Sequence, residues 1–331
     1  MTGTGSGGRA RSQRPKYQPG GTPRPAGGGR RSRTASLTIT LALIAALIAA
    51  SFGLSRLHRA GHSAVKPDNT PVTNGATPTA PPTVAPALFS SADPFAGTPA
   101  AGYADGAAGI VLPTAHVVGG YSATQVRAAY ATMRRILIAA DLNRAVLAGG
   151  TPAAFSRLLI PQQRSWFDRS LGKQGLDRHG FARSTRTWLT SFAPGTTDLV
   201  GAVIKVHGRM TAAGRWSGNS RVLSIRADYL FVYPVQQAGG EPSTRMRIVA
   251  RAVVTVQFAA WNDPGGPLEP WVAGVLGGPA GVLCGINDGF VHPAFPGGPQ
   301  SPVQASGTAV NPYDQSIPPS THGGCQPTTG T

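Results

Sequence analysis

An unbroken apolar run near the N-terminus is the strongest feature of the hydropathy pattern. Residues 37–54, LTITLALIAALIAASFGL, carry no charged side chain. At about 1.5 Å per residue, roughly 18 helical residues cover about 27 Å, which is close to the thickness of the hydrocarbon core of a bilayer. The run therefore predicts a single transmembrane helix.

A helical period appears much later in the chain. Ser122 and Gln125 have the spacing of a capping box, and Gly149 with Gly150 is a typical helix end. Between them, apolar residues recur every three to four positions, which predicts an amphipathic helix. These positions are Val126, Ala129, Tyr130, Met133, Ile136, Leu137, Ala140, Val146 and Leu147.

Two further helical starts are predicted after this helix. Thr151 is expected as an N-cap with Pro152 at the first helical position, and Pro161 is expected to start another turn or two. Residues 183–192, RSTRTWLTSF, fit either a helix or an extended segment.

The period changes from 3.6 to 2 after about residue 199, which predicts antiparallel strands. The expected strands are 203–210, 221–235, 245–260 and 271–284. One face of the second strand would hold Leu223, Ile225, Ala227, Tyr229, Phe231 and Tyr233. Helices followed by long strands predict an α+β domain in which the helices pack on one side of a curved sheet.

Composition divides the chain further, because Gly, Pro, Ser and Thr dominate the segments outside this domain. The predicted order is a basic disordered cytoplasmic arm (1–36), the transmembrane helix (37–54), a Pro/Thr/Gly/Ala-rich linker (55–112), an extracytoplasmic α+β domain (113–295) and a Pro/Gly-rich tail (296–331).

Charge sets the expected orientation of the span. The arm holds no Asp or Glu, and positive residues beside a span tend to stay in the cytoplasm. The arm is therefore expected inside and the large domain outside, as in a single-pass type II membrane protein. The alternative is a cleaved export signal, because Arg30 and Arg31 form a twin-arginine pair, and it too places the domain outside.

The strand register predicts a basic face on the sheet. If Ile204, Val206 and Met210 face the helices, the alternate residues face away from them. These are Lys205, His207, Arg209, Arg226, Arg245, Arg247 and Arg251, with Asp228 as the opposing charge. Such a face suits membrane lipid headgroups, an anionic polymer or a protein partner in the cell envelope. The alternative is a solvated sheet face, and few aromatics interleave, which disfavours nucleic acid.

The opposite face of the sheet raises an enzyme hypothesis. A pocket between helices and sheet would draw on Asp141, Trp188, Tyr229, Phe231 and Tyr233. Catalysis needs a titratable pair, and Asp141 could approach Tyr229 or Tyr233, but it could equally pair with an arginine on the helix surface. The preferred interpretation is that the aromatics are core residues and that Asp141 is a surface or structural acid.

Other chemistry finds little support in the sequence. No catalytic signature, cofactor-binding motif or metal-ligand cluster appears, so no cofactor or metal is expected. The two cysteines, Cys284 and Cys325, are expected to form a disulfide that fastens the tail to the domain. The alternatives are two free thiols and an intermolecular disulfide.

Four segments carry a resemblance to known proteins: ILIAADLNRAVLAGGTPAAFSRLLIPQQRSWF, VIKVHGRM, VLSIRADYLFVYPV and RIVARAVVTVQFA. The chain resembles membrane-anchored actinobacterial proteins with a cystatin-like, nuclear-transport-factor-2-like domain. This fold also occurs in assembly components of type IV secretion and conjugation machines. The resemblance implies a non-enzymatic interaction or assembly module of an envelope, secretion or conjugation complex. The alternative is a small-ligand-binding or isomerase-like enzyme.

Overall fold

The computed structural model describes residues 92–178, 180–240, 242–262, 265–320 and 325–329. The predicted arm and transmembrane helix lie outside these residues. Within them, no helix is both long and apolar enough to span a bilayer.

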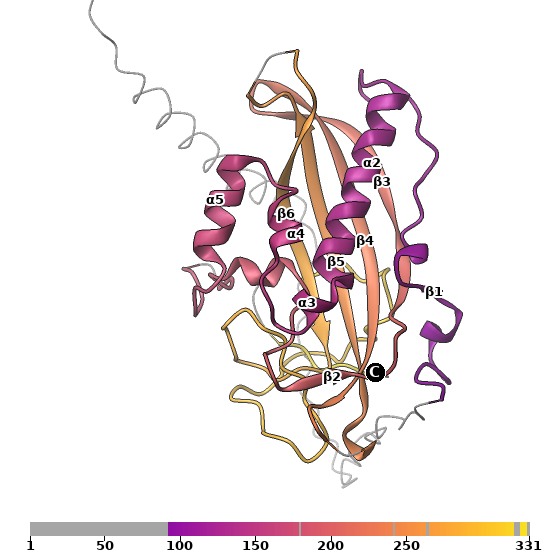
Figure 1. Cartoon of the computed structure of the whole chain (residues 1–331), viewed down its shortest axis with the longest axis vertical. Helices are drawn as coiled ribbons and strands as arrows, with labels where there is room; N and C mark the ends of the chain where they lie inside the picture. The colour runs from indigo at the N-terminus through magenta and orange to yellow at the C-terminus, as the bar shows by residue number, and fades with distance from the viewer. Residues whose placement is uncertain (1–91, 179, 241, 263–264, 321–324, 330–331) are drawn as a thin grey trace, which may run out of the picture. The chain divides into compact units, whose positions relative to one another are not determined.

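The described chain forms helices on one side of an antiparallel sheet (Figure 1), so the predicted α+β class is confirmed. The helices are α2 (Ala123–Leu137), α3 (Arg144–Leu147), α4 (Ala153–Ser156) and α5 (Pro161–Ser170). The strands are β1 (Ala104–Asp105), β2 (Thr197–Leu199), β3 (Lys205–Ser217), β4 (Ser220–Gln237), β5 (Met246–Ala259) and β6 (Glu269–Ala280). Their order is β1-β3-β4-β5-β6, and β2 pairs with β4.

Helix α2 begins as the sequence predicts. The Ser122 hydroxyl accepts a hydrogen bond from the Gln125 N–H, and the Gln125 side chain accepts one from the Ser122 N–H. The helix is shorter than predicted, because a π-helical turn (Ile138–Leu142) follows it and Asn143 then caps α3 with its side chain. The prediction of one uninterrupted helix from residue 122 to 149 was therefore wrong.

The second predicted helix start was displaced by one residue. Pro152, not Thr151, is the N-cap residue of α4, and no side chain caps that helix. Pro161 does begin α5. The ambiguous segment 183–192 contains a short 3-10 helix (Thr185–Trp188).

The strand alternation is confirmed for β4 and β5. Tyr229 on β4 pairs with Ala252 on β5, and both contribute to the large core under the helices. Strand β3 runs beyond its predicted end at residue 210 to a two-residue turn, where Ser217 pairs with Ser220. Gly218 adopts φ +57° there, a conformation that glycine tolerates and that such tight hairpins need.

Helix α5 is fastened to β6 by one side chain. The Gln163 amide donates to the Val272 carbonyl oxygen at 2.8 Å and accepts from the Val272 N–H at 2.9 Å. The Gln163 side chain therefore hydrogen-bonds to the strand backbone as a neighbouring strand would, and it fixes α5 against β6.

A second, smaller core lies on the side of the sheet away from α2. It joins Leu230 and Val232 of β4 and Val249 of β5 to Phe95 and Tyr313. Phe95 belongs to the predicted linker 55–112 and Tyr313 to the predicted tail 296–331. The described parts of both segments therefore pack on the domain, because each supplies an aromatic side chain that covers apolar sheet positions.

Candidate functional site

The outer face is defined here as the side chains of β3, β4 and β5 that point away from α2. The register puts six of the seven predicted basic residues on this side, because their neighbours Val206, Met210 and Ile248 belong to the core under the helices. The seventh, Arg245, directly precedes β5 and lies outside the paired register. The face is not open, however. Residues 93–105 and 311–317 cover much of it and occupy several of these basic side chains.

Arg247 is the clearest departure from the expected exposed face. Only 2% of it is exposed. Its guanidinium donates to the carbonyl oxygens of Pro94 at 2.6 Å and Ala96 at 3.2 Å. Burial lowers the pKa of Arg247, and the nearby Tyr313 and Asp93 oppose that shift. The prediction that Arg247 is an exposed partner-binding residue was therefore wrong, because this side chain is buried and holds the segment around Pro94 and Ala96 that covers it.

Lys205 and His207 contact the same covering segment. Lys205 forms an ion pair with Asp105 at 2.7 Å and donates to the Tyr103 carbonyl oxygen at 3.1 Å. The His207 ring stacks on the Tyr103 ring, with centroids 4.6 Å apart. Both side chains thus hold the stretch that leads into β1.

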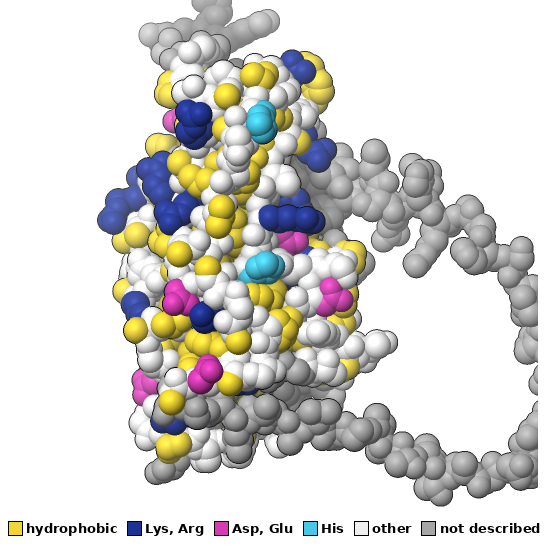
Figure 2. Space-filling model, turned by 90° about the vertical axis from the view of Figure 1, so that its right-hand side faces the viewer, with side chains coloured by type: hydrophobic (Ala, Val, Ile, Leu, Met, Phe, Trp, Pro, Cys, Tyr) yellow, Lys and Arg dark blue, Asp and Glu magenta, His cyan; other side chains and the backbone are white. Residues whose placement is uncertain are grey.

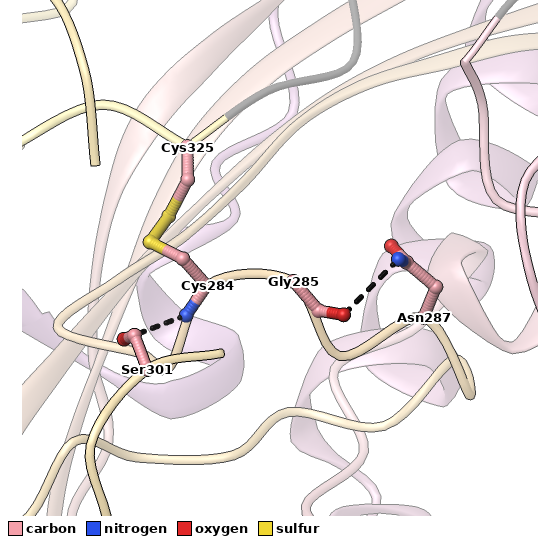
Figure 3. Close-up of a disulfide and its surroundings, with 5 residues drawn as sticks. All are labelled: Cys284, Gly285, Asn287, Ser301 and Cys325. Carbon is pink, nitrogen blue, oxygen red and sulfur yellow. Dashed lines mark hydrogen bonds between the residues drawn. A yellow bond between two sulfur atoms is a disulfide. The ribbon is translucent and has the colours of Figure 1, made fainter. Parts of the chain in front are cut away.

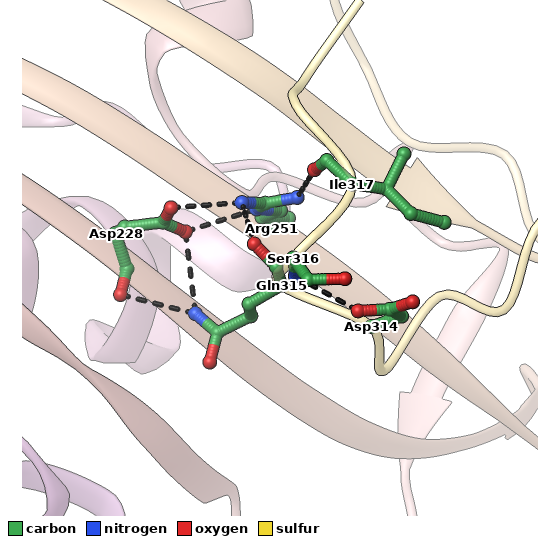
Figure 4. Close-up of polar contacts among 6 residues, drawn as sticks. All are labelled: Asp228, Arg251, Asp314, Gln315, Ser316 and Ile317. Atoms are coloured by element: carbon green, nitrogen blue, oxygen red, sulfur yellow. Dashed lines mark hydrogen bonds and ion pairs between the residues drawn. The ribbon is translucent and has the colours of Figure 1, made fainter.

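Arg251 fixes the tail to the sheet (Figure 4). Its guanidinium donates to both carboxylate oxygens of Asp228, at 2.9 and 2.8 Å, and also to the carbonyl oxygens of Gln315 and Ile317. The Gln315 amide donates in turn to Asp228. Burial alone would raise the pKa of Asp228, but the hydrogen bonds and charge of Arg251 outweigh it and hold the pKa below its usual value.

Three residues of the predicted set stay exposed: His207, whose ring stacks on Tyr103, and the arginines Arg209 and Arg226. Arg245 is half-buried and donates to Gln236. Arg209 pairs with Asp228 and Thr211 with Arg226, so the two arginines are diagonal neighbours on adjacent strands. On the face of the molecule shown in Figure 2, Lys and Arg side chains gather mainly in the upper half. The open basic surface on the sheet is therefore smaller than the sequence predicts.

Under the helices, Asp141 lies beside Tyr233. Asp141 belongs to the π-helical turn and is 3% exposed. The Thr190 hydroxyl donates to its carboxylate at 2.8 Å, and the Tyr233 hydroxyl donates to its backbone carbonyl at 2.8 Å. Burial raises the pKa of Asp141 to about 7, and the hydrogen bonds from Thr190 only partly offset this. Burial and the charge of Asp141 raise the pKa of Tyr233.

The other predicted pocket residues do not gather around Asp141 in one cavity. Tyr229 and Phe231 are fully buried, and the Tyr229 hydroxyl donates to the Val111 carbonyl oxygen at 3.4 Å. Burial raises the pKa of Tyr229 to about 12. Trp188 instead lines an open hollow of about 320 Å³ beside α5, whose lining does not include Asp141. The aromatics on the sheet therefore fill core space.

The two cysteines lie at disulfide-bonding distance, with Cα atoms 5.7 Å apart, and Figure 3 shows the bond between them. The Cys284 N–H donates to the Ser301 hydroxyl, and the Ser306 N–H donates to the Cys325 carbonyl oxygen. The crosslink thus joins the segment after β6 to the tail. In the described part of the chain, no three His, Cys, Asp or Glu residues group as metal ligands.

Sequence reasoning missed the covering segments. Phe95 and Tyr103 are aromatic residues in a stretch rich in Pro, Ala and Gly, and that isolated apolar pair was the available signal. Trp166, which lines the hollow together with Trp188, lies in the helix that was expected to start at Pro161, and no functional role was predicted for it.

Comparisons with known proteins find no match: no family model fits the chain, and no curated protein or solved structure is significantly similar to it.

Proposed function

We propose that this chain is a membrane-anchored, extracytoplasmic interaction or assembly module of an envelope, secretion or conjugation complex, with a cystatin-like domain. The observation that carries the proposal is the filled space between helices and sheet. Tyr229, Phe231 and Tyr233 are 0% exposed, so the sheet face that could line a pocket is core. Recognition is then a property of the surface, where Arg209 and Arg226 remain exposed.

The covered outer face supports a structural role for the segment that follows the linker. Arg247 donates hydrogen bonds to the backbone carbonyl oxygens of Pro94 and Ala96. Lys205 donates to the carbonyl oxygen of Tyr103. The chain that would come from the membrane is therefore fastened to the sheet before it reaches α2. Such a fixed entry point suits a module that presents a surface in a set orientation to lipid headgroups and envelope proteins.

In-cell crosslinking of the full-length chain tests this function. Expressed with its N-terminal segment in a high-GC actinobacterium, the chain is expected to crosslink to envelope, secretion or conjugation proteins that copurify with it. Recovery of the chain without any protein partner would contradict the proposal.

One observation favours a second function, a small-ligand-binding or isomerase-like enzyme. Asp141 is a buried carboxyl group with a pKa of about 7 beside Tyr233, and such a group can exchange a proton near neutral pH. A thermal-shift screen with small hydrophobic ligands tests this alternative. A ligand that stabilises the natural chain but not the Asp141→Asn variant would support it, and a flat response would reject it.

A further inference from the structure

The hollow beside α5 has walls that are fixed by hydrogen bonds from several segments. The Thr185 hydroxyl donates to the Phe167 carbonyl oxygen at 2.7 Å, and the Ser184 hydroxyl donates to that of Leu171 at 2.7 Å. The Gly175 N–H donates to the Asn287 carbonyl oxygen at 2.8 Å. The hollow is thus formed before any ligand arrives, which lowers the entropic cost of binding.

Its aromatic wall is open to solvent. Trp166 of α5 is 47% exposed and lies against Trp188, with ring centroids 5.4 Å apart. Trp188 in turn contacts the buried Phe167 at 5.7 Å, so the core holds the pair in place. A large exposed aromatic surface that the core fixes in place is unusual unless something packs on it.

Charged side chains complete the lining. Lys173 and Arg183 supply two cations, and Asp177 supplies one carboxylate, whose Oδ1 accepts from the Phe181 N–H. All three side chains are exposed. A guanidinium matches a carboxylate in shape and hydrogen bonding, so the lining combines a flat apolar wall with a rim that favours an acid.

We propose that this hollow binds an acidic sugar unit of an anionic glycan. The flat C–H face of a pyranose ring packs on an indole, and its carboxylate would meet Lys173 and Arg183, while Asp177 accepts from ring hydroxyls. A volume of about 320 Å³ lies at the small end of ligand sites, which suits one or two rings better than a protein segment. The inference rests on the proposed function in one respect: the domain would meet such glycans only if it lies on the extracytoplasmic side of the membrane.

Calorimetric titration of the full-length chain in mild detergent tests the site. The probes are trigalacturonate and neutral maltotriose, which have the same number of α-1,4-linked rings. Trigalacturonate is expected to bind at least about tenfold more tightly, as an added charged contact allows. Trp166→Ala should weaken trigalacturonate binding about tenfold or more, and Trp166→Phe should retain much of it.

Two further variants distinguish recognition of the carboxylate from a nonspecific loss of binding. The double variant Lys173→Gln, Arg183→Gln should remove the preference for the acid and leave maltotriose binding unchanged. Trp216→Ala is the matched control, because Trp216 is 71% exposed near the end of β3 and does not line the hollow, so its removal should not affect binding.

Two results would overturn the inference: no binding of trigalacturonate, or equal binding by the natural chain and Trp166→Ala. Because the titration needs no cell, its failure leaves the assembly function intact. A failure of in-cell crosslinking likewise leaves the sugar site intact, so the two proposals are tested apart.

Discussion

Arg251 donates two hydrogen bonds to the carboxylate of Asp228 and, with the same guanidinium, two more to the backbone of the tail. The side chains of the pair are 14% and 21% exposed, so water screens them little. Arg251 thereby links β5, β4 and residues 315–317. A residue that looks like part of a binding face is in fact the attachment point of the tail.

Replacing Arg251 by Ala should lower the free energy of unfolding by about 2–3 kcal/mol, because it leaves Asp228 partly buried without its cation. Denaturant unfolding measures this, and hydrogen exchange should show faster exchange in residues 311–317. Arg245→Ala is the control, since the Arg245 side chain donates to the Gln236 side chain and its backbone bond to Pro242 is kept in the variant, and it should cost less than about 1 kcal/mol. Unchanged exchange in the tail of Arg251→Ala would refute the attachment.

The Arg251–Asp228 pair also has a defined pH dependence. The pKa of Asp228 is lower in the folded chain than its usual value, so the folded state favours the ionised form. The pair's stabilisation should be complete above about pH 4 and be lost as pH falls through the folded pKa. Acid titration of stability should therefore show a smaller loss below pH 4 in Asp228→Asn than in the natural chain.

Removing the Arg247 guanidinium should release the segment that covers the outer face. Arg247→Met keeps an apolar stem but leaves the Pro94 and Ala96 carbonyl oxygens without their donor. The expected cost is about 2–4 kcal/mol, with new protease cleavage in residues 93–105. Phe95→Ala should cause the same cleavage by loss of apolar packing. Resistance to protease in both variants would show that the segment does not need these contacts.

Asp141 should make stability fall as pH rises. Its pKa is raised to about 7, so the folded chain holds a proton that the unfolded chain releases near pH 4. Stability is therefore lost between about pH 4 and pH 7, by up to about 4 kcal/mol at 1.36 kcal/mol per pKa unit. Asp141→Asn should flatten this part of the profile when unfolding is followed from pH 4 to pH 8. A steep decline that persists in the variant would assign the effect to another group.

Breaking the disulfide should loosen the tail and leave the sheet folded. Cys284 and Cys325 are 41 residues apart, which corresponds to about 4 kcal/mol in the chain-entropy view. The double variant Cys284→Ser, Cys325→Ser is expected to unfold at lower denaturant and to be cut in residues 300–320. A thiol assay on the unreduced natural chain that finds two free cysteines would contradict the bond.

The strands were predictable because a period of two leaves one residue in two on the core side, as Tyr229 and Ala252 illustrate. The start of α2 was also predictable, because Ser122 and Gln125 have the spacing of a capping box. The break at Asn143 was not predictable, because the π-helical turn before it contacts Thr190 and Tyr233 through Asp141, and no local pattern reports such tertiary contacts.

The candidate site was harder to predict for a physical reason. Alternation tells which way Arg247 points, but it does not tell what covers that side of the sheet. The covering contacts join residues about 150 positions apart, such as Pro94 and Arg247, and no local pattern reports them. The same holds for Trp188, whose neighbour Trp166 comes from another element.

The most direct test of the assembly function compares charge reversals on two surfaces in the full-length chain. Arg209→Glu with Arg226→Glu reverses the two exposed arginines of the outer face. Arg127→Glu with Arg135→Glu reverses two exposed arginines of α2 as a matched control. The yield of crosslinked envelope partner in cells should fall at least about tenfold in the first variant only, since opposite charges then become like charges. Equal yields in both variants would contradict the role of the outer face in partner binding.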